Sequence, residues 1–170
     1  MEKHARFSWA AKIMNIKSND YLLEIGCGVG MAIEEIAPLL KQGKIIGIDR
    51  SDKMIKTAEQ RNGRYIDEGN VELLKTDLLH LPIRQQQFNK VFCFNINLFW
   101  TQKSVEKEVA MIKSVLKKNG SLFIFYGPMV ASGLGKIKEP MIQNLKKEKI
   151  KVEQDFYDKA LNCCGFKCAI

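Results

Sequence analysis

Short apolar runs alternate with helix-like patterns along most of the chain. Five runs have the length of a strand: residues 21–25, 44–49, 70–75, 90–96 and 121–126. Three segments between them carry apolar residues at helical spacing: residues 31–42, 51–62 and 104–120. This alternation predicts an α/β fold, with a Rossmann-like, doubly wound and mostly parallel sheet in a single domain.

Local signals define where the three helices begin and end. Pro38 is expected to bend the first helix or to end its regular part, and Ser51 to cap the second. Met54, Ile55 and Ala58 are expected to face inward from that second helix. The third helix is expected to end at Gly120.

The C-terminal part of the chain allows two interpretations. Residues 127–135 resemble a loop, and a helix is expected near residues 139–149. The last twenty residues form either two strands joined by a turn near 159–162, or a helix over 153–164 followed by one strand. Alternating apolar residues favour the strand pair: Cys164, Phe166, Cys168 and Ile170. We therefore expect a domain over residues 21–170, preceded by a helical segment, residues 1–20, that can act as a lid.

Composition limits the classes of protein that fit. The 170 residues carry a net charge of +8, and the second part is the more basic, because residues 101–170 hold 13 basic and 7 acidic residues. A basic half permits a polyanionic partner, but its lysines are spread from Lys103 to Lys167, and there is no arginine-rich block with interleaved aromatic residues, so nucleic acid is not favoured. No apolar run approaches the ~18–20 residues that span a bilayer. The N-terminus lacks a secretory signal, so a cytoplasmic location is expected.

Five cysteines are present, and three of them cluster at residues 163–168. An odd number without a signal sequence argues against a disulfide framework. The cluster lacks paired CxxC spacing, and His4 and His80 are the only histidines of the chain. We therefore expect small buried thiols and no metal site.

Polar residues and glycines stand where the predicted strands end. The first strand ends on Glu24 and three alternating glycines, the second on Asp49, and the third on Asp77. The fourth ends on residues 95–97. Since ligands of doubly wound sheets bind at the carboxyl ends of the strands, these groups should converge on one site.

Two ligand classes fit this set of residues. A dinucleotide would place its pyrophosphate on the glycine turn and its ribose on Asp49, but Met31 stands where that pattern has its third glycine, and Glu24 would repel phosphate. A ligand with an amino-acid end removes both objections. Asp49 would then accept from the ribose hydroxyls and Asp77 from the adenine amino group, with Met54 and Leu78 on either side of the ring. Such a ligand is S-adenosylmethionine (SAM).

These motifs resemble those of class I SAM-dependent methyltransferases over most of residues 20–126. The matching segments are residues 24–30, 47–49, 51–54, 76–78 and 116–120. The resemblance implies SAM as cofactor and an antiparallel last strand. It also implies a set of cofactor-binding residues: Glu24, Gly26, Cys27, Gly28, Asp49, Arg50, Met54, Asp77, Leu78 and Asn95.

Within that class, the compact layout is similar to the methyltransferases of ubiquinone and menaquinone biosynthesis, and residues 94–100 lack the NPPY-type motif of amino-methylating enzymes. A small-molecule acceptor is therefore expected. Methyltransfer to RNA or protein, or a non-catalytic SAM-binding subunit, stays open. No residue is identified as a catalytic base. Candidates for the acceptor pocket are His4, Asn97, Trp100 and Tyr126.

Overall fold

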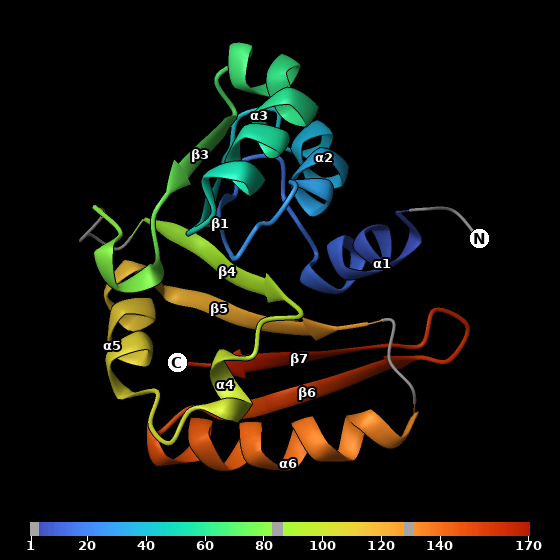
Figure 1. The fold of residues 1–170 in the computed structure, drawn as a ribbon, viewed down its shortest axis with the longest axis vertical. Helices are drawn as coiled ribbons and strands as arrows, with labels where there is room; N and C mark the ends of the chain where they lie inside the picture. The colour runs from blue at the N-terminus through green and yellow to red at the C-terminus, as the bar shows by residue number, and fades with distance from the viewer. Residues whose placement is uncertain (1–3, 83–86, 128–130) are drawn as a thin grey trace.

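The computed structural model describes residues 4–82, 87–127 and 131–170. A sheet of seven strands runs through the molecule, with helices packed on both of its faces (Figure 1). The strand order is β3-β2-β1-β4-β5-β7-β6, and β7 runs antiparallel to both of its neighbours. The strands are β1 (Tyr21–Ile25), β2 (Lys44–Asp49), β3 (Val71–Lys75), β4 (Phe88–Phe94), β5 (Leu116–Tyr126), β6 (Lys151–Asp158) and β7 (Cys163–Ala169). The predicted fold class is confirmed.

Helices cover the two faces of the sheet in separate groups. Helices α1, α2 and α3 contribute to one apolar cluster, and α4, α5 and α6 contribute to the other. Among the described residues, the helices are α1 (Ala5–Met14), α2 (Met31–Ile36), η1 (Ala37–Leu39), α3 (Asp52–Asp67), η2 (Leu78–His80), α4 (Leu98–Thr101), α5 (Glu106–Val115) and α6 (Ala131–Lys147). None of them has the length and apolar character needed to cross a membrane.

Successive strand residues belong to opposite apolar clusters. In β1, Leu22 packs in the cluster of α1 and α2, whereas Leu23 packs in the cluster of α5 and α6. In β4, Phe92 packs in the cluster of α1 and α2, and Cys93 packs in the cluster of α5 and α6. Because side chains of a strand point alternately to the two faces, a sheet covered on both sides requires continuous apolar runs. This explains why the central strands were recognisable in the sequence.

The N-terminal helix α1 is held against the body of the domain. Phe7 is 4% exposed, and its ring lies 4.9 Å from that of Phe94 in an edge-on contact. Trp9 makes a similar contact with Phe125 at 5.9 Å between ring centroids. Buried aromatic pairs of this kind stabilise the packing of an element. The aromatic residues of α1 therefore clamp it onto β4 and β5.

Several local predictions are confirmed. The regular helix α2 ends at Ile36, before a 3-10 turn that contains Pro38. The Ser51 hydroxyl accepts a hydrogen bond from the Met54 backbone N–H, at 3.3 Å, and so caps α3. The last twenty residues form the strand pair of β6 and β7. All five cysteines are buried and free.

Three local predictions are wrong. Met54 does not face inward with Ile55 and Ala58, because it lies on the solvent side of α3 and is 36% exposed, whereas Ile55 and Ala58 are buried. The helix α5 ends at Val115, and residues 116–120 belong to β5, because Leu116 pairs with Phe88 and is buried there.

Helix α6 already begins at Ala131, so the expected loop over residues 127–135 is too long. Residues 128–130 of that loop lie outside the described residues.

Candidate cofactor and acceptor site

The carboxyl ends of the central strands border one cavity of about 570 Å³. It lies where the chain changes direction in the sheet, since β1 has β2 on one side and β4 on the other. One wall comes from the ends of β1, β2 and β3, and the opposite wall from the end of β4 and from α4. The described lining is Ile25, Gly26, Ile48, Asp49, Arg50, Thr76, Asp77, Leu78, Leu79, Phe94, Asn95, Ile96, Asn97, Leu98, Thr101, Gln102 and Glu108.

The glycine loop, residues 26–30, follows β1 and has a backbone conformation that other residues adopt only with strain. Gly26, Gly28 and Gly30 have φ angles of 71°, 54° and 74°. A Cβ atom on Gly26 would lie 2.8 Å from Cγ2 of Ile96, across the cavity wall. The backbone N–H groups of Gly26 and Cys27 donate to the carbonyl of Ile48 at 2.8 and 2.9 Å. The loop is thus fixed to the end of β2.

Asp49 connects the glycine loop to the beginning of α3. Its Oδ2 accepts a hydrogen bond from the Gly28 backbone N–H at 3.0 Å, and its Oδ1 accepts one from the Ser51 backbone N–H at 2.9 Å. Each carboxylate oxygen has a further lone pair, so both can still accept from a ligand. Asp49 therefore combines a role in loop geometry with accepting capacity toward the cavity.

Glu24 is a buried carboxyl group directly below the glycine loop. It is 2% exposed, and its neighbours on the adjacent strands are Gly47 and Phe92. Its Oε2 has no hydrogen-bond partner among the described residues. Burial, and then the negative charge of Asp49, raise the pKa of Glu24 from 4.5 to about 8. A positively charged group placed near this carboxyl group would lower the pKa of Glu24 again.

Cys27 is also buried in the loop. Burial, followed by the charges of Glu24 and Asp49, raises the pKa of its thiol far above its usual range. The thiol therefore stays protonated and unreactive at neutral pH.

Asp77 closes the far end of this wall. Its Oδ1 accepts hydrogen bonds from the backbone N–H groups of Leu79 and His80, both at 3.0 Å, and lies 2.8 Å from His80 Nδ1. The hydrogen bond with the His80 side chain lowers the pKa of Asp77, so the carboxylate is ionised. Leu78 is buried beside it and lines the cavity, whereas Met54 is not among the described lining residues.

Asn95 occupies the end of β4 in a left-handed conformation, with φ of 53°. Its side chain donates to the Gly127 carbonyl at 2.9 Å and accepts from the Gly127 backbone N–H at 2.8 Å. The amide group therefore ties the end of β4 to the end of β5. Asn95 and the exposed Asn97 both line the cavity.

The other three candidates for the acceptor pocket are not among the described lining residues. Tyr126 is 3% exposed and its hydroxyl donates to the Ile96 carbonyl at 3.0 Å, so it supports the cavity wall from behind. Trp100 packs partly buried against the apolar core. His4 lies at the start of α1, with Nδ1 4.0 Å from Glu34 Oε2.

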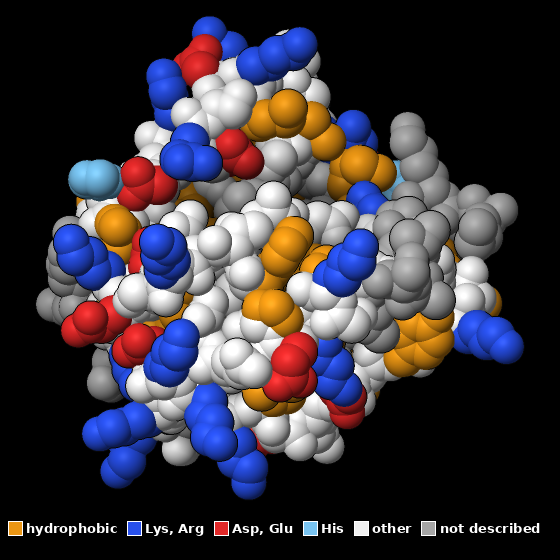
Figure 2. All heavy atoms as spheres, turned by 60° about the horizontal axis from the view of Figure 1, so that its bottom comes forward, with side chains coloured by type: hydrophobic (Ala, Val, Ile, Leu, Met, Phe, Trp, Pro, Cys, Tyr) orange, Lys and Arg blue, Asp and Glu red, His pale blue; other side chains and the backbone are white. Residues whose placement is uncertain are grey.

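The basic residues of the C-terminal half do not gather around this cavity. Four of them line a separate groove between α6 and β6: Lys138, Lys146, Lys149 and Lys151. Figure 2 turns the α4 and α6 side toward the viewer, where lysine and arginine side chains are scattered among acidic, apolar and uncharged ones. The described cavity lining has one cation, Arg50, and three carboxylates, of Asp49, Asp77 and Glu108. This charge balance is unfavourable for a phosphate backbone.

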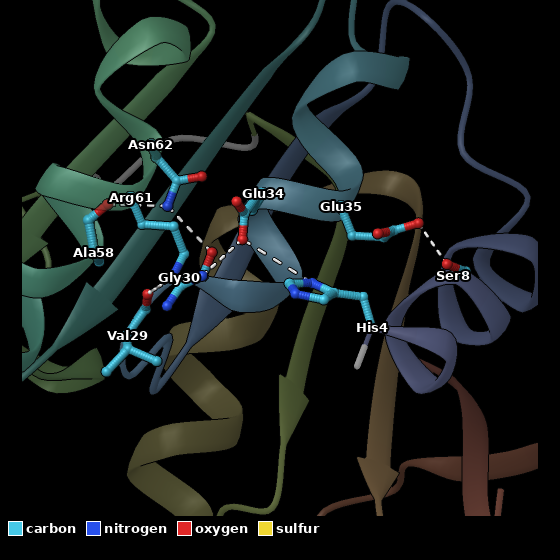
Figure 3. Close-up of polar contacts among 9 residues, drawn as sticks. All are labelled: His4, Ser8, Val29, Gly30, Glu34, Glu35, Ala58, Arg61 and Asn62. Carbon is cyan, nitrogen blue, oxygen red and sulfur yellow. Dashed lines mark hydrogen bonds and ion pairs between the residues drawn. The ribbon is translucent and has the colours of Figure 1, made fainter. Parts of the chain in front are cut away.

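Two residues of α3 that the sequence did not single out contact the glycine loop (Figure 3). Arg61 Nε donates to the Val29 carbonyl at 2.9 Å, and Asn62 Nδ2 donates to the Gly30 carbonyl at 3.1 Å. Ala58 and Asn62 are four residues apart and therefore lie on the same side of α3. This spacing is the one feature of the sequence that could have indicated that Asn62 faces inward.

The strand order, the antiparallel β7 and the glycine loop beside Asp49 define the fold and site of a class I SAM-dependent methyltransferase. Residues 22–120 match the family model described as a methyltransferase domain. Because this match covers more than half of the chain, the protein belongs to the methyltransferase domain family. The expected class and cofactor are confirmed.

Individual relatives agree with this assignment. The chain is 29% identical over 135 residues to YrhH of Bacillus subtilis, a methyltransferase-like protein, covering 78% of this chain and 69% of the relative. It is 29% identical over 115 residues to demethylmenaquinone methyltransferase of Lactobacillus johnsonii, covering 66% of this chain and 46% of the relative. The solved structure of a SAM-dependent methyltransferase from Aquifex aeolicus has a TM-score of 0.73 at 20% identity, over 95% of this chain and 88% of that one.

Proposed function

We propose that this chain transfers the methyl group of SAM to a small-molecule acceptor in the strand-end cavity. The observation that carries the proposal is the division of that cavity between two walls. One wall presents Gly26 of the glycine loop, Asp49 and Asp77, and the other presents neutral groups from the end of β4 and from α4, while α5 adds the carboxylate of Glu108.

The first wall fits SAM in two respects. Open space lies where a Cβ atom of Gly28 would stand, and this forms a cradle in which a ligand can lie against the loop backbone. The unpaired Oε2 of buried Glu24 provides an acceptor beneath this cradle for an ammonium group. Residues 26–28 would then hold the amino-acid end of SAM. In this segment Cys27 would act as a small side chain and not as a reactive thiol.

The adenosine part would lie along the same wall. Asp49 would accept from the ribose hydroxyls and Asp77 from the adenine amino group, while Leu78 forms an apolar surface for the ring. Arg50 and Met54 are exposed at the outer side of this region, where they would cover the adenine. Asn95 would act by fixing the end of β4, since its amide is bonded to Gly127.

The chemistry needs little from the protein beyond alignment. SAM supplies a methyl group that is already activated by the positive charge on its sulfur. The chain's contribution is to hold donor and acceptor in line and to exclude water between them. The fixed loop and the ordered end of β4 serve this purpose, because Asp49, Asn95 and Tyr126 anchor both walls through hydrogen bonds.

A small acceptor without phosphate groups is supported by the second wall. Its described side chains are apolar, as in Phe94, Ile96 and Leu98, or neutral and polar, as in Asn97 and Thr101. The relative from Lactobacillus johnsonii is named for a small-molecule acceptor, demethylmenaquinone. Methyltransfer to RNA is less favoured, because the lysine-lined groove of α6 and β6 shares no described residue with the cavity.

The proposal is tested in two steps. Isothermal titration should detect binding of S-adenosylhomocysteine (SAH) and no binding of NAD; the opposite result would refute SAM as the ligand. Transfer of labelled methyl groups from SAM into a fractionated cell extract should then place the label in the low-molecular-weight fraction. Label that appears instead in RNA or protein would refute the small-molecule acceptor.

A further inference from the structure

The carbonyl groups at the end of the glycine loop are held by two adjacent side chains of α3. Arg61 reaches the Val29 carbonyl through Nε, and Asn62 reaches the Gly30 carbonyl through Nδ2 (Figure 3). Both carbonyls belong to the segment that leads from the loop into α2. Side chains that fix consecutive carbonyls restrict the backbone between them.

Asn62 is fully enclosed at this contact. It is 0% exposed, and its Nδ2 also donates to the Ala58 carbonyl at 2.9 Å. A Cβ atom on Gly30 would lie 2.5 Å from Nδ2 of Asn62 and 2.9 Å from Cβ of Ala58. The backbone of Gly30 therefore approaches α3 so closely that only glycine fits there. At this contact, Asn62 Nδ2 donates to the Gly30 carbonyl.

Arg61 fixes the loop from a second direction. While Nε donates to Val29, Nη1 donates to Glu34 Oε2 at 2.9 Å, and Glu34 lies in the first turn of α2. One guanidinium thus joins the loop to the helix that follows it. The fork of an arginine suits two acceptors in fixed directions, which lysine, with its single ammonium, matches less well.

These contacts are not required by α3 itself. The next arginine of the helix, Arg64, pairs with Glu68 on the solvent side, and its side chain is 79% exposed. Arg64 has the same chemistry in the same helix, three residues along, but within the described part of the chain its side chain pairs with Glu68 and makes no hydrogen bond with the loop. The direction of Arg61 and Asn62 toward the loop is therefore a specific feature of these two positions.

We propose that Arg61 and Asn62 are positioning residues for SAM binding: they hold the glycine loop in the conformation that receives the amino-acid end of SAM. This inference rests on the proposed function, since it takes the loop as the site of that end. Neither side chain touches the ligand. Their effect is transmitted through the carbonyls of Val29 and Gly30.

The experiment compares two ligands on matched variants. SAH has the amino-acid end, whereas 5′-methylthioadenosine lacks it and depends on the adenosine-binding wall. In Arg61→Gln, calorimetry should show SAH binding weakened about tenfold, as expected for the loss of a charged hydrogen bond, and 5′-methylthioadenosine binding changed by less than about twofold. Arg61→Lys should recover part of the SAH affinity, and Arg64→Gln should bind both ligands like the wild type.

Asn62→Ala provides the second variant, because it removes the donor without placing a charge at this buried position. It should show the same selective loss of SAH affinity. Equal weakening of both ligands in Arg61→Gln, or unchanged SAH binding, would overturn the proposal, because a general loss of stability does not distinguish the ligands. Failure of the wild-type protein to bind SAH would instead refute the proposed function, so the two failures are distinguishable.

Discussion

Glu24→Gln should change how the stability of the protein depends on pH. The carboxyl group is 2% exposed, and burial with the charge of Asp49 raises its pKa from 4.5 to about 8. The folded protein therefore binds this proton more tightly than the unfolded chain does. As a result, the wild type loses free energy of unfolding as the pH rises from 4.5 to about 8, and this contribution is absent from the variant.

The magnitude follows from the two pKa values. At about 1.36 kcal/mol for each tenfold change in proton affinity, Glu24 lowers the free energy of unfolding by about 3 kcal/mol between pH 5 and pH 8. This is a large fraction of the ~5–15 kcal/mol that stabilises a typical domain. The glutamine amide has its own cost of burial, but that cost does not change with pH, so the slope is the quantity to compare.

Urea unfolding at one-unit intervals from pH 5 to pH 9 measures this slope. The difference in the free energy of unfolding between Glu24→Gln and the wild type should shift in favour of the variant by about 3 kcal/mol over pH 5 to 8. Glu59→Gln, on the exposed side of α3, is the matched control and should follow the wild type. Parallel profiles for Glu24→Gln and the wild type would refute the reasoning, because they would mean that the Glu24 carboxyl ionises normally.

Three further substitutions test the two walls of the cavity. Asp49→Ala should weaken SAH binding at least about tenfold, because it removes the acceptor of the Gly28 N–H and the proposed ribose partner; an unchanged affinity in calorimetry would contradict the ribose assignment. Gly26→Ala should cost about 1–2 kcal/mol of stability for its left-handed φ alone. It should also weaken SAH binding, since the new Cβ would displace Ile96, which lines the same cavity; wild-type binding in that variant would argue against this cavity as the SAM site. Tyr126→Phe should cost about 1 kcal/mol in thermal unfolding and leave SAH affinity within about twofold, because the hydroxyl only supports the Ile96 carbonyl. A large loss of SAH affinity would instead place Tyr126 in contact with the ligand.

The sheet could be predicted from the sequence because both of its faces are buried. Such strands need continuous apolar runs, and those runs stand out against polar helix faces. The starts of β5 and α6 were not predictable in the same way. Residues 116–120 carry two lysines that suit a helix, and only the pairing of Leu116 with Phe88 places them in the sheet.

The candidate site was predictable where a strand end determines a position. Asp49, Asp77 and Gly26 of the glycine loop border the cavity because parallel strands place their carboxyl ends on one edge. Side-chain directions were not predictable. Asn95 turns to Gly127, and Tyr126 turns behind the wall to Ile96, because each satisfies a backbone group that no local pattern reveals. Arg61 and Asn62 were missed because their partners lie 32 residues away in the chain.

The pairing of β1 with β4 divides the sheet into two halves that border different parts of the cavity. The half before this junction carries the wall proposed for SAM, and the half after it carries the wall proposed for the acceptor. Backbone hydrogen bonds between Leu22–Ile25 and Lys90–Cys93 hold the junction, and the ring contact of Trp9 with Phe125 crosses it. A chimaera that takes its residues after β4 from a relative, but keeps Phe125 for the contact with Trp9, would then keep its methyl donor while acquiring a different acceptor, which makes this junction a natural place for new specificities to arise.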